Sequence, residues 1–454
     1  MRKWLFAALF IALGGVALAE EKTWKAGVAV RTVTPAESMW MAGYASRDKP
    51  AEGKETELFV KALAIEDPSG SRVVLLTSDL IGIPRSLSVE VAEDVKRKTG
   101  LTRDRLMLTV SHTHCGPVVR DNLADMYPMP PDEVKKITPY ADKLRGWMVE
   151  AVVEAISRLK PARLAVGRGT ARFAVNRRNN VEKKVPQMRE AGEALRGPID
   201  HDVPVLRVAD ADGKLVAVVF GYACHNTTMQ FYRWCGDYAG FAQEELEKRH
   251  KGAVALFWTG CGGDQNPLPR SKIELCRGYG KQLADAVEDT LAGKLTPVTG
   301  ALTARYAEIA LPYAQVPGPE QLAADMLSKT LAVRKRAENL KRRLDESGKI
   351  DDRYPYYPVQ VWRLGDQVTW VALGGEVVVD YSLRVKKELA GDRAVWVTAY
   401  ANDVLAYIPS ERVLKEGGYE GETSMVYYGL PSKWAPGLED KIVGKVKELD
   451  AIRR

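Results

Sequence analysis

The chain has 454 residues, of which 46% are hydrophobic and 28% are charged, so its composition excludes disordered and fibrous proteins. The formal net charge of +7 is small for this length, and no basic stretch alternates with aromatic residues or matches a nucleic-acid-binding motif, so no nucleic acid partner is expected. Peripheral contact with an anionic membrane surface is compatible with this charge.

The first residues have the pattern of an export signal. Two basic residues precede the apolar run 4–16, which ends at the small residues of an Ala-x-Ala cleavage site. That run is too short to span a bilayer, and no later segment is apolar enough to do so. We therefore expect residues 1–19 to be a signal peptide and the mature chain, 20–454, to be exported, either to the periplasm or by secretion. A buried N-terminal helix is the less favoured alternative.

Strand and helix patterns alternate along the first three hundred residues. Short apolar and β-branched runs predict strands, some paired through tight turns, and apolar residues at helical spacing predict the helices between them. The strands are expected at 25–33, 58–65, 72–78, 105–112, 205–208, 215–222 and 253–259, and the helices at 87–98, 140–159, 241–250 and 273–291. Because hairpins are mixed with strand–helix alternation, the sequence predicts an α/β fold with a mixed β-sheet core flanked by helices.

The segment 319–346 interrupts this alternation. It is rich in Lys, Arg, Glu, Leu and Ala, and its apolar residues recur at helical spacing, which predicts a helical insertion formed by a hairpin or by one long surface helix. Strands are expected again at 359–364 and 368–373, followed by a helix at 377–389. No linker rich in Pro, Gly or Ser divides the chain, so we expect one large, elaborated domain.

Two histidines lie in the heptapeptide 111–117, Ser-His-Thr-His-Cys-Gly-Pro, at the end of a predicted strand. In an extended strand, residues i and i+2 point to the same face, so His112 and His114 are expected side by side. Active sites of α/β folds lie at such strand ends, and imidazole is a common zinc ligand. The pair therefore indicates a metal site, with two histidines packed at a sheet edge as the alternative.

Three later segments have residues of a similar kind. His225 follows the predicted strand 215–222 and is either a second imidazole ligand or a core histidine. Glu376 follows an apolar strand and two glycines, where a buried carboxylate is costly unless it is paired or bound to a metal, although an acid also suits the start of the next helix. The glycine-rich loop 260–267 lacks the spacing of a phosphate-binding loop, and we interpret it as an active-site wall or a simple turn.

The cysteines are too few for a disulfide scaffold. They are Cys115, Cys224, Cys235, Cys261 and Cys276. Their odd number leaves at least one without a partner in the same chain, and no CxxC or CxxCH motif is present. A nucleophilic Cys115 activated by the preceding histidine is an alternative that strand geometry disfavours, because neighbours in a strand face opposite sides.

Together these motifs resemble the catalytic domain of the neutral/alkaline non-lysosomal ceramidases. The heptapeptide 111–117 is similar to that family's His-Thr-His-x-Gly-Pro signature, and Met-Ala-Gly-Tyr at 41–44 is similar to its Met-x-Gly-Tyr motif. The other similar blocks, in the family's order, are Ser78-Asp79, Asn176-Arg177, His225, Gly263-Asp264, Glu376 and 402–419. Two positions depart from the family pattern, since Cys115 stands where ceramidases usually have serine and Val404 replaces an aromatic residue.

The resemblance implies a zinc-dependent amidohydrolase. The side chains that it implies as zinc ligands are His112, His225, Glu376 and Tyr407. It also implies that His114 is the general acid/base, and that Arg177 and Tyr419 hold the substrate amide or its oxyanion.

The implied reaction is cleavage of a linear N-acyl amide, as in N-acylsphingosine, which would yield a fatty acid and a sphingoid base. The partner would then be a small-molecule or lipid substrate. Because the chain ends soon after these motifs, we expect the family's C-terminal immunoglobulin-like domain to be absent, which favours the alternative of a zinc-dependent esterase, lactonase or deacetylase acting on a carbohydrate or small metabolite. A non-catalytic binding protein is disfavoured because every implied ligand is retained.

Overall fold

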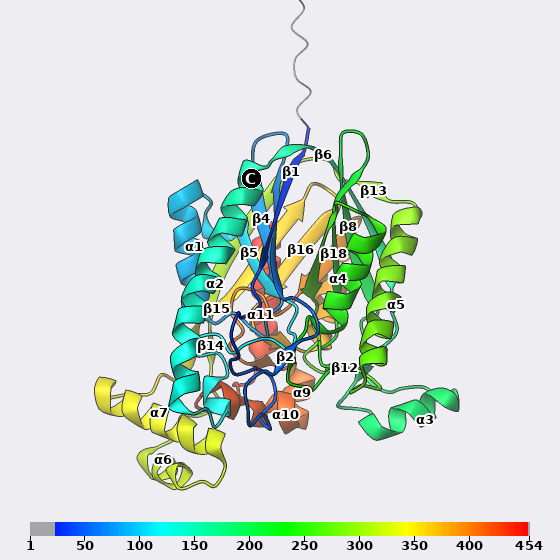
Figure 1. The fold of residues 1–454 in the computed structure, drawn as a ribbon. Coiled ribbons are helices and arrows are strands. Elements are labelled where there is room, and N and C mark those ends of the chain that lie inside the picture. Colours follow the sequence, from blue (N-terminus) through cyan, green and yellow to red (C-terminus); the bar gives the residue numbers. More distant parts are fainter. Residues whose placement is uncertain (1–22, 453–454) are drawn as a thin grey trace, which may run out of the picture.

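The structure is a computed structural model that describes residues 23–452. The expected signal peptide, residues 1–19, lies outside the described residues. Two β-sheets lie face to face, and helices cover their outer faces (Figure 1). Within the described range, none of the helices combines the length and the hydropathy needed to cross a membrane.

The larger sheet has nine strands within the described range and mixes parallel with antiparallel pairs. In spatial order its strands are β11 (Val254–Thr259), β9 (Leu215–Tyr222), β8 (Asp202–Asp210), β6 (Lys160–Thr170), β1 (Lys25–Thr32), β3 (Phe59–Glu66), β4 (Arg72–Ser78) and β5 (Leu106–Val110), with β13 (Thr296–Pro297) beside β6. The pairs β4–β5 and β9–β11 are parallel. Strands such as β4, which contains the apolar run Val-Val-Leu-Leu at 73–76, are buried on both faces. The predicted mixed sheet is confirmed.

The two edge strands of the larger sheet approach each other at one end. Thr259, which ends β11, donates from Oγ1 to the backbone oxygen of Val110, which ends β5, over 2.8 Å. The backbone after β5 also bridges the backbone after β9. Twist accumulates across a sheet of this width, and here it brings the edges together. The carboxyl ends of β5 and β9, which are followed by His112 and His225, therefore lie side by side.

The smaller sheet packs against the larger one through tryptophan side chains. Its strands, in order, are β14 (Leu302–Pro312), β15 (Arg353–Leu364), β16 (Val368–Leu373) and β18 (Ala394–Thr398). Trp258 of β11 faces Trp370 of β16, with ring centroids 5.7 Å apart, and Trp396 of β18 lies 5.1 Å from Trp370. Buried aromatic pairs of this kind contribute strongly to a core, so the two sheets share one interior.

Helices cover the outside of both sheets (Figure 1). The larger sheet is covered by α2 (Pro131–Ser157), with α1 (Arg85–Thr99) packed on it, and by α4 (Asp237–Arg249) and α5 (Ile273–Ala292), whereas α8 (Val379–Glu388) and α11 (Leu438–Ala451) cover the smaller sheet. Helix α2 starts at Pro131 rather than at 140, because proline suits the first turn of a helix, where its missing N–H is not needed. The predicted helix is confirmed, but it ends at Ser157 and not at 159.

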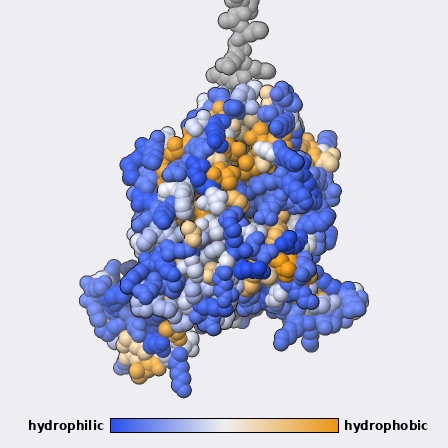
Figure 2. Space-filling model, in the orientation of Figure 1, coloured by the Kyte–Doolittle hydropathy of each residue, from blue (hydrophilic) through white to orange (hydrophobic). Residues whose placement is uncertain are grey.

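The segment 319–346 forms a hairpin of two helices rather than one long helix. These are α6 (Pro319–Met326) and α7 (Leu331–Ser347), and they share a small core of their own around Leu322 and Leu340. The hairpin projects at the lower left of Figure 1. Figure 2 shows hydrophobic colour at the end of α6, where Leu327 is 87% exposed.

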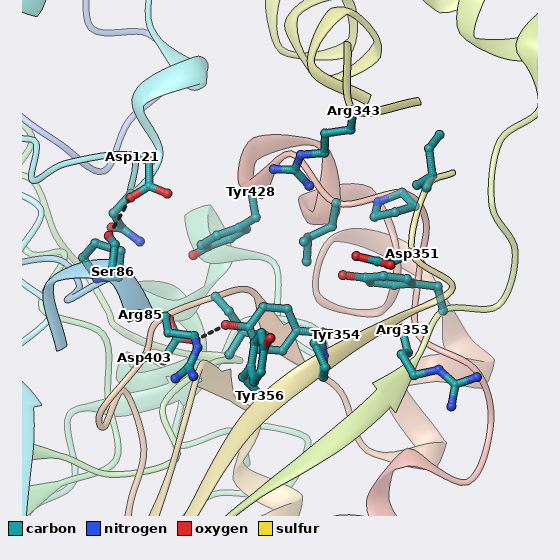
Figure 3. Close-up of a pocket in the computed structure, with 18 of the residues that line it drawn as sticks. Arg85, Ser86, Asp121, Arg343, Asp351, Arg353, Tyr354, Tyr356, Asp403 and Tyr428 are labelled. Atoms are coloured by element: carbon teal, nitrogen blue, oxygen red, sulfur yellow. Dashed lines mark hydrogen bonds between the residues drawn. The ribbon is translucent and has the colours of Figure 1, made fainter. Parts of the chain in front are cut away.

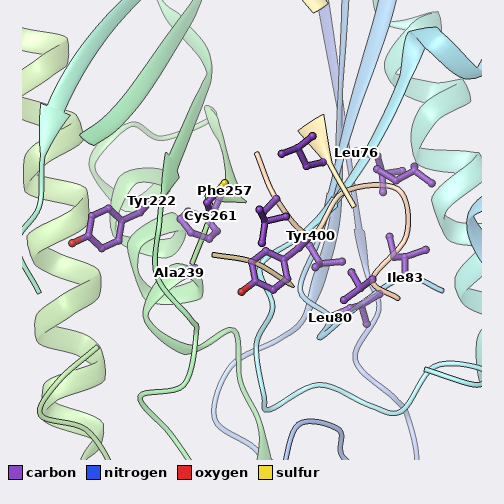
Figure 4. Close-up of a cluster of buried hydrophobic side chains, with 14 of the residues drawn as sticks. Leu76, Leu80, Ile83, Tyr222, Ala239, Phe257, Cys261 and Tyr400 are labelled. Atoms are coloured by element: carbon purple, nitrogen blue, oxygen red, sulfur yellow. The ribbon is translucent and has the colours of Figure 1, made fainter. Parts of the chain in front are cut away.

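Short elements complete the part of the fold that surrounds the strand ends. They are β2 (Gly53–Lys54), β7 (Ala174–Asn176), β10 (Arg233–Trp234), β12 (Gln265–Pro267), β17 (Glu376–Val377), β19 (Tyr407–Ile408), α3 (Val185–Glu190), α9 (Glu411–Glu416), α10 (Gly418–Gly421) and the 3-10 helix η4 (Thr423–Tyr428). Buried apolar side chains such as Leu76, Phe257 and Tyr400 pack behind this region (Figure 4). The ring of Tyr400 lies 4.4 Å from that of His112, so the site rests directly on the core.

Candidate metal centre

His112 lies just beyond β5, where the backbone leaves the strand. Its φ is +59°, in the left-handed region that residues other than glycine rarely adopt, and β5 already ends at Val110. The prediction of an extended chain through His112 to His114 was therefore wrong, because a turn and not strand alternation brings the two rings together. Their Nε2 atoms are 3.1 Å apart. Unusual backbone geometry at a buried polar residue is typical of functional sites.

His225 lies beyond β9 and faces Glu376. Its Nε2 is 3.1 Å from Oε2 of Glu376, and Nε2 of His112 is 3.2 Å from the same oxygen. All three side chains are buried. Two imidazoles, one after the edge strand β5 and one after β9, therefore meet at one carboxylate oxygen.

Strand pairing brings Tyr407 to the same point. Strands β17 and β19 pair in parallel with Glu376 opposite Tyr407, and Oη of Tyr407 lies 3.1 Å from Nε2 of His225. Gly375 permits this approach, because its φ is +75° and a Cβ at this position would lie 2.6 Å from the backbone oxygen of Ala406. The four side chains expected as ligands are thus neighbours in the structure.

Backbone carbonyls orient both of these imidazoles. Nδ1 of His112 lies 2.6 Å from the carbonyl oxygen of Ile81, and Nδ1 of His225 lies 2.6 Å from that of Gly262. A carbonyl can only accept a hydrogen bond, so each Nδ1 carries a proton, and in a neutral ring Nε2 then has a lone pair directed at Glu376. Burial, together with the charge of Arg177, lowers the pKa of His225 to about 4, so this ring is neutral at pH 7.

The donor set fits a divalent cation. With each ring proton on Nδ1, two nitrogen lone pairs face one carboxylate oxygen of Glu376 at about 3 Å, which is unfavourable unless a cation or a proton lies among them. Two imidazoles, a carboxylate and a phenol oxygen are ligand types that zinc accepts.

His114 lies between these side chains and a cavity. Burial, with the neighbouring His112 and His225, lowers its pKa well below the usual value. Its Nδ1 has no hydrogen-bond partner among the described residues. One ligand atom from each of the three histidines lies within 4.8 Å of the others, so a three-histidine metal site is also geometrically available.

The Met-Ala-Gly-Tyr motif packs on the ring of His114. Gly43 has a φ of +108°, and a Cβ at this position would lie 2.5 Å from the imidazole. The ring of Tyr44 is 4.8 Å from the same imidazole, and Arg47 donates to the backbone oxygen of His114 over 2.6 Å. The sequence analysis identified this motif only as similar to a family motif. In the structure, the motif packs on the His114 ring and restricts its position.

Arg177 and Tyr419 lie on the other side of Tyr407. Nη2 of Arg177 is 3.1 Å from Oη of Tyr407, and Nε donates to Oε1 of Glu420 over 2.7 Å. The guanidinium carbon of Arg177 also lies 5.7 Å from the centre of the Tyr419 ring. Burial lowers the pKa of Arg177, but Tyr407 and Glu420 outweigh it and keep the guanidinium charged. Tyr419 is 41% exposed, so its ring is accessible from solvent.

These residues open into a cavity of about 610 Å³, here called the mouth. Its sixteen lining residues include His114, Tyr407 and Tyr419. The charged side chains that line it are Arg177, Arg178, Arg270, Glu182, Glu416 and Glu420. No aliphatic residue is among the described residues that line the mouth.

One residue that shapes the site had not been identified from the sequence. Tyr428, at the end of η4, donates from Oη to Oε1 of Glu376. A tyrosine before a glycine is common in ordinary turns, so no signal in the sequence pointed to Tyr428.

Asp264, which the sequence marked only as part of a block similar to the family, connects the glycine-rich loop to its neighbours. It accepts from the side-chain amide of Asn176 and from the backbone N–H of Val379, both over 2.9 Å.

A second cavity, of about 460 Å³, is lined by Tyr428 (Figure 3). It shares no lining residue with the mouth among the described residues. Figure 3 shows the hydroxyl of Tyr354 directed at Asp403, while Arg343 reaches in from α7. Burial raises the pKa of the Asp403 carboxyl to about 7.

Cys115 is buried next to His114, and burial raises the pKa of its thiol well above the usual value. A thiol in this state is a poor nucleophile, which argues against the cysteine alternative. All five cysteines lie in the described range, and all five are free and buried.

Residues 24–306 match the family model described as "Neutral/alkaline non-lysosomal ceramidase, N-terminal". The neutral ceramidase of Pseudomonas aeruginosa is 27% identical over 276 residues, which cover 58% of this chain and 40% of that protein. Neutral ceramidase A of Dictyostelium discoideum is 25% identical over 252 residues, which cover 54% of this chain and 35% of that protein. The matched region thus spans less than half the length of these curated relatives.

Solved structures show the same fold. The crystal structure of neutral ceramidase from Pseudomonas aeruginosa has a TM-score of 0.72 and 21% identity, covering 95% of this chain and 74% of that one. A structure described as a ceramidase complexed with C2 also has a TM-score of 0.72, with 20% identity over 94% of this chain and 74% of the other. At this level of identity the likeness establishes the arrangement of sheets and helices.

Proposed function

The chain belongs to the neutral/alkaline non-lysosomal ceramidase family, and from that membership we propose that it is a zinc-dependent hydrolase of linear N-acyl amides. The observation that carries the proposal is the meeting of Nε2 of His112 and Nε2 of His225 at one oxygen of Glu376, with both Nδ1 atoms bonded to backbone carbonyls. A carbonyl bonded to Nδ1 fixes the ring so that Nε2 is directed at the metal.

The proposed zinc ligands are His112, His225, Glu376 and Tyr407. When bound, zinc supplies Lewis acidity and lowers the pKa of a water molecule towards about 7. Burial and the charge of Glu376 raise the pKa of the Tyr407 phenol, and the guanidinium of Arg177, 3.1 Å from its oxygen, offsets part of that rise, so Tyr407 would serve as a neutral phenol ligand. Tyr428 supports the set by donating to the second oxygen of Glu376, which leaves the first oxygen facing the imidazoles.

Proton transfer is assigned to His114. Hydrolysis of an amide removes a proton from the attacking water and delivers one to the departing nitrogen, so one base that later acts as an acid is sufficient. His114 lines the mouth and lies beside the proposed ligands, which places an imidazole between the substrate space and the attack site. The close packing of Gly43 and Tyr44 restricts its ring.

Arg177 and Tyr419 are proposed to hold the amide carbonyl as it gains negative charge. Fixed donors at a developing oxyanion stabilise the transition state more than the substrate. Arg177 is held in place by Glu420 and Asn266, at 2.7 Å and 3.2 Å, so its guanidinium is oriented before substrate arrives. The exposed ring of Tyr419 lies beside it at the edge of the mouth.

The relatives are named neutral ceramidases, so N-acylsphingosines are the reference substrates for this proposal. The test is to purify the protein, measure bound zinc by mass spectrometry, and follow release of sphingosine from N-acetylsphingosine before and after dialysis against a chelator. We expect close to one zinc per chain, loss of turnover with the metal, and recovery when zinc is restored. Turnover that persists after complete zinc removal would contradict the proposal.

A second candidate function keeps the metal site but changes the substrate to an ester, a lactone or an N-acetylated carbohydrate. The charged side chains that line the mouth are compatible with such substrates. An amide paired with its matching ester identifies an esterase, which would turn over only the ester, and an N-acetylated sugar beside an N-acylsphingosine identifies a deacetylase.

Export is proposed from residues 1–19. Expression in a Gram-negative host should yield a periplasmic protein whose first residue is Glu20. N-terminal sequencing of the periplasmic fraction checks this, and an intact Met1 in that fraction would contradict cleavage at the expected site.

A further inference from the structure

The two most exposed large hydrophobic side chains of the described residues lie on different segments. Leu327 is 87% exposed and Val181 is 61% exposed. Leu327 follows α6 in the turn of the helical hairpin, whereas Val181 directly precedes Glu182, which lines the mouth. A single exposed hydrophobic side chain is common on a protein surface, so the position of these two relative to each other decides what they mean.

Both segments lie at the end of the molecule that contains α10 (Figure 1). The hairpin α6–α7 projects on one side and α3 on the other, and α10, which carries Tyr419 of the mouth, lies between them. Helix α7 contacts η4, and the ring of Tyr427 in η4 lies 6.2 Å from that of Tyr419. A flat surface that touched both projections would therefore lie across the mouth.

Unpaired lysines follow both apolar side chains. Lys183 and Lys184 lie in one segment and Lys329 lies in the other, and all three are exposed. None of these lysine side chains has a hydrogen bond or an ion pair within the range that the structure describes. The acidic neighbour Glu182 is neutralised by Arg270, which binds both of its oxygens. Apolar side chains flanked by free cations are typical of surfaces that dock on anionic lipids.

We propose that this end of the molecule docks on an anionic lipid bilayer, with the two apolar side chains among the lipids and the lysines at the headgroups. The docking face is defined by Val181, Lys183, Lys184, Leu327 and Lys329. Each lysine near an anionic surface strengthens binding by about fivefold, and the apolar contacts add to this attraction. A second copy of this chain fits less well, because a symmetric contact would bring the lysines together.

The test is cosedimentation with lipid vesicles in the absence of substrate. The protein is the expected mature chain, 20–454, which lacks the apolar run 4–16. One set of vesicles is pure phosphatidylcholine, and the other contains an equal part of phosphatidylglycerol. We expect much tighter binding to the anionic set at low salt, and its loss at about 1 M salt, where the Debye length is about 3 Å. Equal binding to both sets, or binding to neither, would overturn the proposal.

Variants of the apolar side chains test insertion. V181S/L327S should weaken binding to the anionic vesicles by about tenfold or more, because two side chains that leave water are lost. The matched control L383S/I452S replaces two exposed apolar side chains outside the docking face and should leave binding unchanged. Equal binding by the variant and the control would overturn the proposal.

Variants of the lysines test the attraction to anionic headgroups. K183Q/K184Q/K329Q should bind the anionic vesicles about a hundredfold more weakly and should lose most of the salt dependence. The control K98Q/K251Q/K294Q removes the same charge from three exposed lysines outside the docking face and should retain tight binding. A loss as large in the control would show attraction by net charge alone, which contradicts a defined face.

A labelled cysteine reports the orientation on the membrane. All five natural cysteines lie in the described range and are buried, so a dye that reacts with thiols should label only an introduced one. The emission of a polarity-sensitive dye should shift to the blue in L327C on anionic vesicles and should not shift in I452C. A shift in I452C alone would overturn the proposal.

The remaining outcomes separate this proposal from the proposed function. Dimers that V181S/L327S abolishes, in a protein that binds no vesicles, would show that a second copy covers the face and would overturn the docking proposal. Hydrolysis of a soluble N-acyl amide by a protein that binds no vesicles would overturn docking alone. Vesicle binding by a zinc-loaded protein that hydrolyses no amide would support docking and overturn the proposed function.

Discussion

The three histidines of the site differ in what holds them. His112 and His225 each have Nδ1 bonded to a backbone carbonyl at 2.6 Å, whereas Nδ1 of His114 has no partner among the described residues. A ligand histidine normally has its second nitrogen anchored, because the anchor fixes the tautomer and the ring plane. This contrast supports two imidazole ligands and one imidazole that transfers protons.

The division of roles predicts different outcomes for two alanine variants. His112→Ala should lose both zinc and activity, since it removes an anchored donor. His114→Ala should retain zinc and lose activity by roughly 10²–10⁴-fold, the usual contribution of a general acid/base. Metal content by mass spectrometry and kcat check both, with His250→Ala, directly after the end of α4 and bonded to Glu288, as the control that changes neither. Loss of zinc from His114→Ala would instead indicate the three-histidine site.

Asp403 predicts a pH dependence of stability. Burial raises the pKa of its carboxyl from 3.8 to about 7, although the hydroxyl of Tyr354 partly offsets the shift. Between these two pH values the folded protein keeps a proton that the unfolded chain has released, so this group makes the free energy of unfolding fall as the pH rises. The fall is about 4 kcal/mol at most for a shift of this size.

Asp403→Asn should remove that dependence, because the amide does not titrate and its oxygen can still accept from Tyr354. The free energy of unfolding, measured with urea at pH 4 to 8, is then plotted against pH for the natural protein and for the variant. The two plots should diverge up to pH 7 and run parallel above it. Asp351→Asn, an exposed carboxyl of the same cavity, controls for the loss of one negative charge. Equal slopes for the natural protein and Asp403→Asn throughout would contradict the buried, protonated carboxyl.

At the scale of elements, apolar strands could be predicted and polar ones could not. The ranges 72–78, 215–222 and 368–373 coincide with β4, β9 and β16, since their buried faces leave unbroken hydrophobic runs. Strand β6 begins with Lys-Pro and contains Arg and Gly, so its local preference for a strand is weak. Strand β6 lies within the larger sheet because it pairs with β1 and β8. These pairings involve residues far apart in the sequence, so a local pattern cannot predict them.

The site could be predicted in its residues but only partly in its geometry. The motif 111–117 and the resemblance to a family pointed to side chains that the structure brings together. Strand alternation predicted that His112 and His114 are neighbours, which they are, but the chain there is not a strand. A turn with a positive φ at His112 brings the two rings together. Contacts such as that of Tyr428 with Glu376 depend on where a distant helix packs, so no local signal encodes them.

The loop around Gly43 predicts an effect of backbone position on catalysis. Gly43→Ala should lower kcat by at least tenfold and leave zinc bound, because the added Cβ would lie 2.5 Å from the ring of His114 and displace it. Gly70→Ala is the matched control, since Gly70 also has a positive φ, +90°, but a Cβ there would meet nothing within 4 Å. Both variants should lose about 1 kcal/mol of stability from backbone strain. Equal kcat in the two variants would show that Gly43 does not position His114.

At the scale of the whole molecule, the two sheets each supply half of the proposed ligand set. His112 and His225 follow strands of the larger sheet, while Glu376 and Tyr407 follow β16 and β18 of the smaller one. The tryptophans between the sheets lie in one continuous core. A cation bound at this point would therefore link the sheets a second time, which is consistent with the expectation of a single domain.

Zinc should accordingly stabilise the molecule as one unit. A ligand that binds only the folded state adds about 2.7 kcal/mol when its free concentration is a hundred times its Kd, so calorimetry should show a Tm that rises with zinc and falls with chelator. Tryptophan fluorescence reports on all ten tryptophans, among them Trp258, Trp370 and Trp396 between the sheets, and far-ultraviolet circular dichroism reports on all elements. The two signals should give the same transition with and without metal. His225→Ala should unfold at a Tm that does not respond to zinc. Two separate transitions, of which only one moves with zinc, would show that the sheets unfold independently and would contradict the single domain.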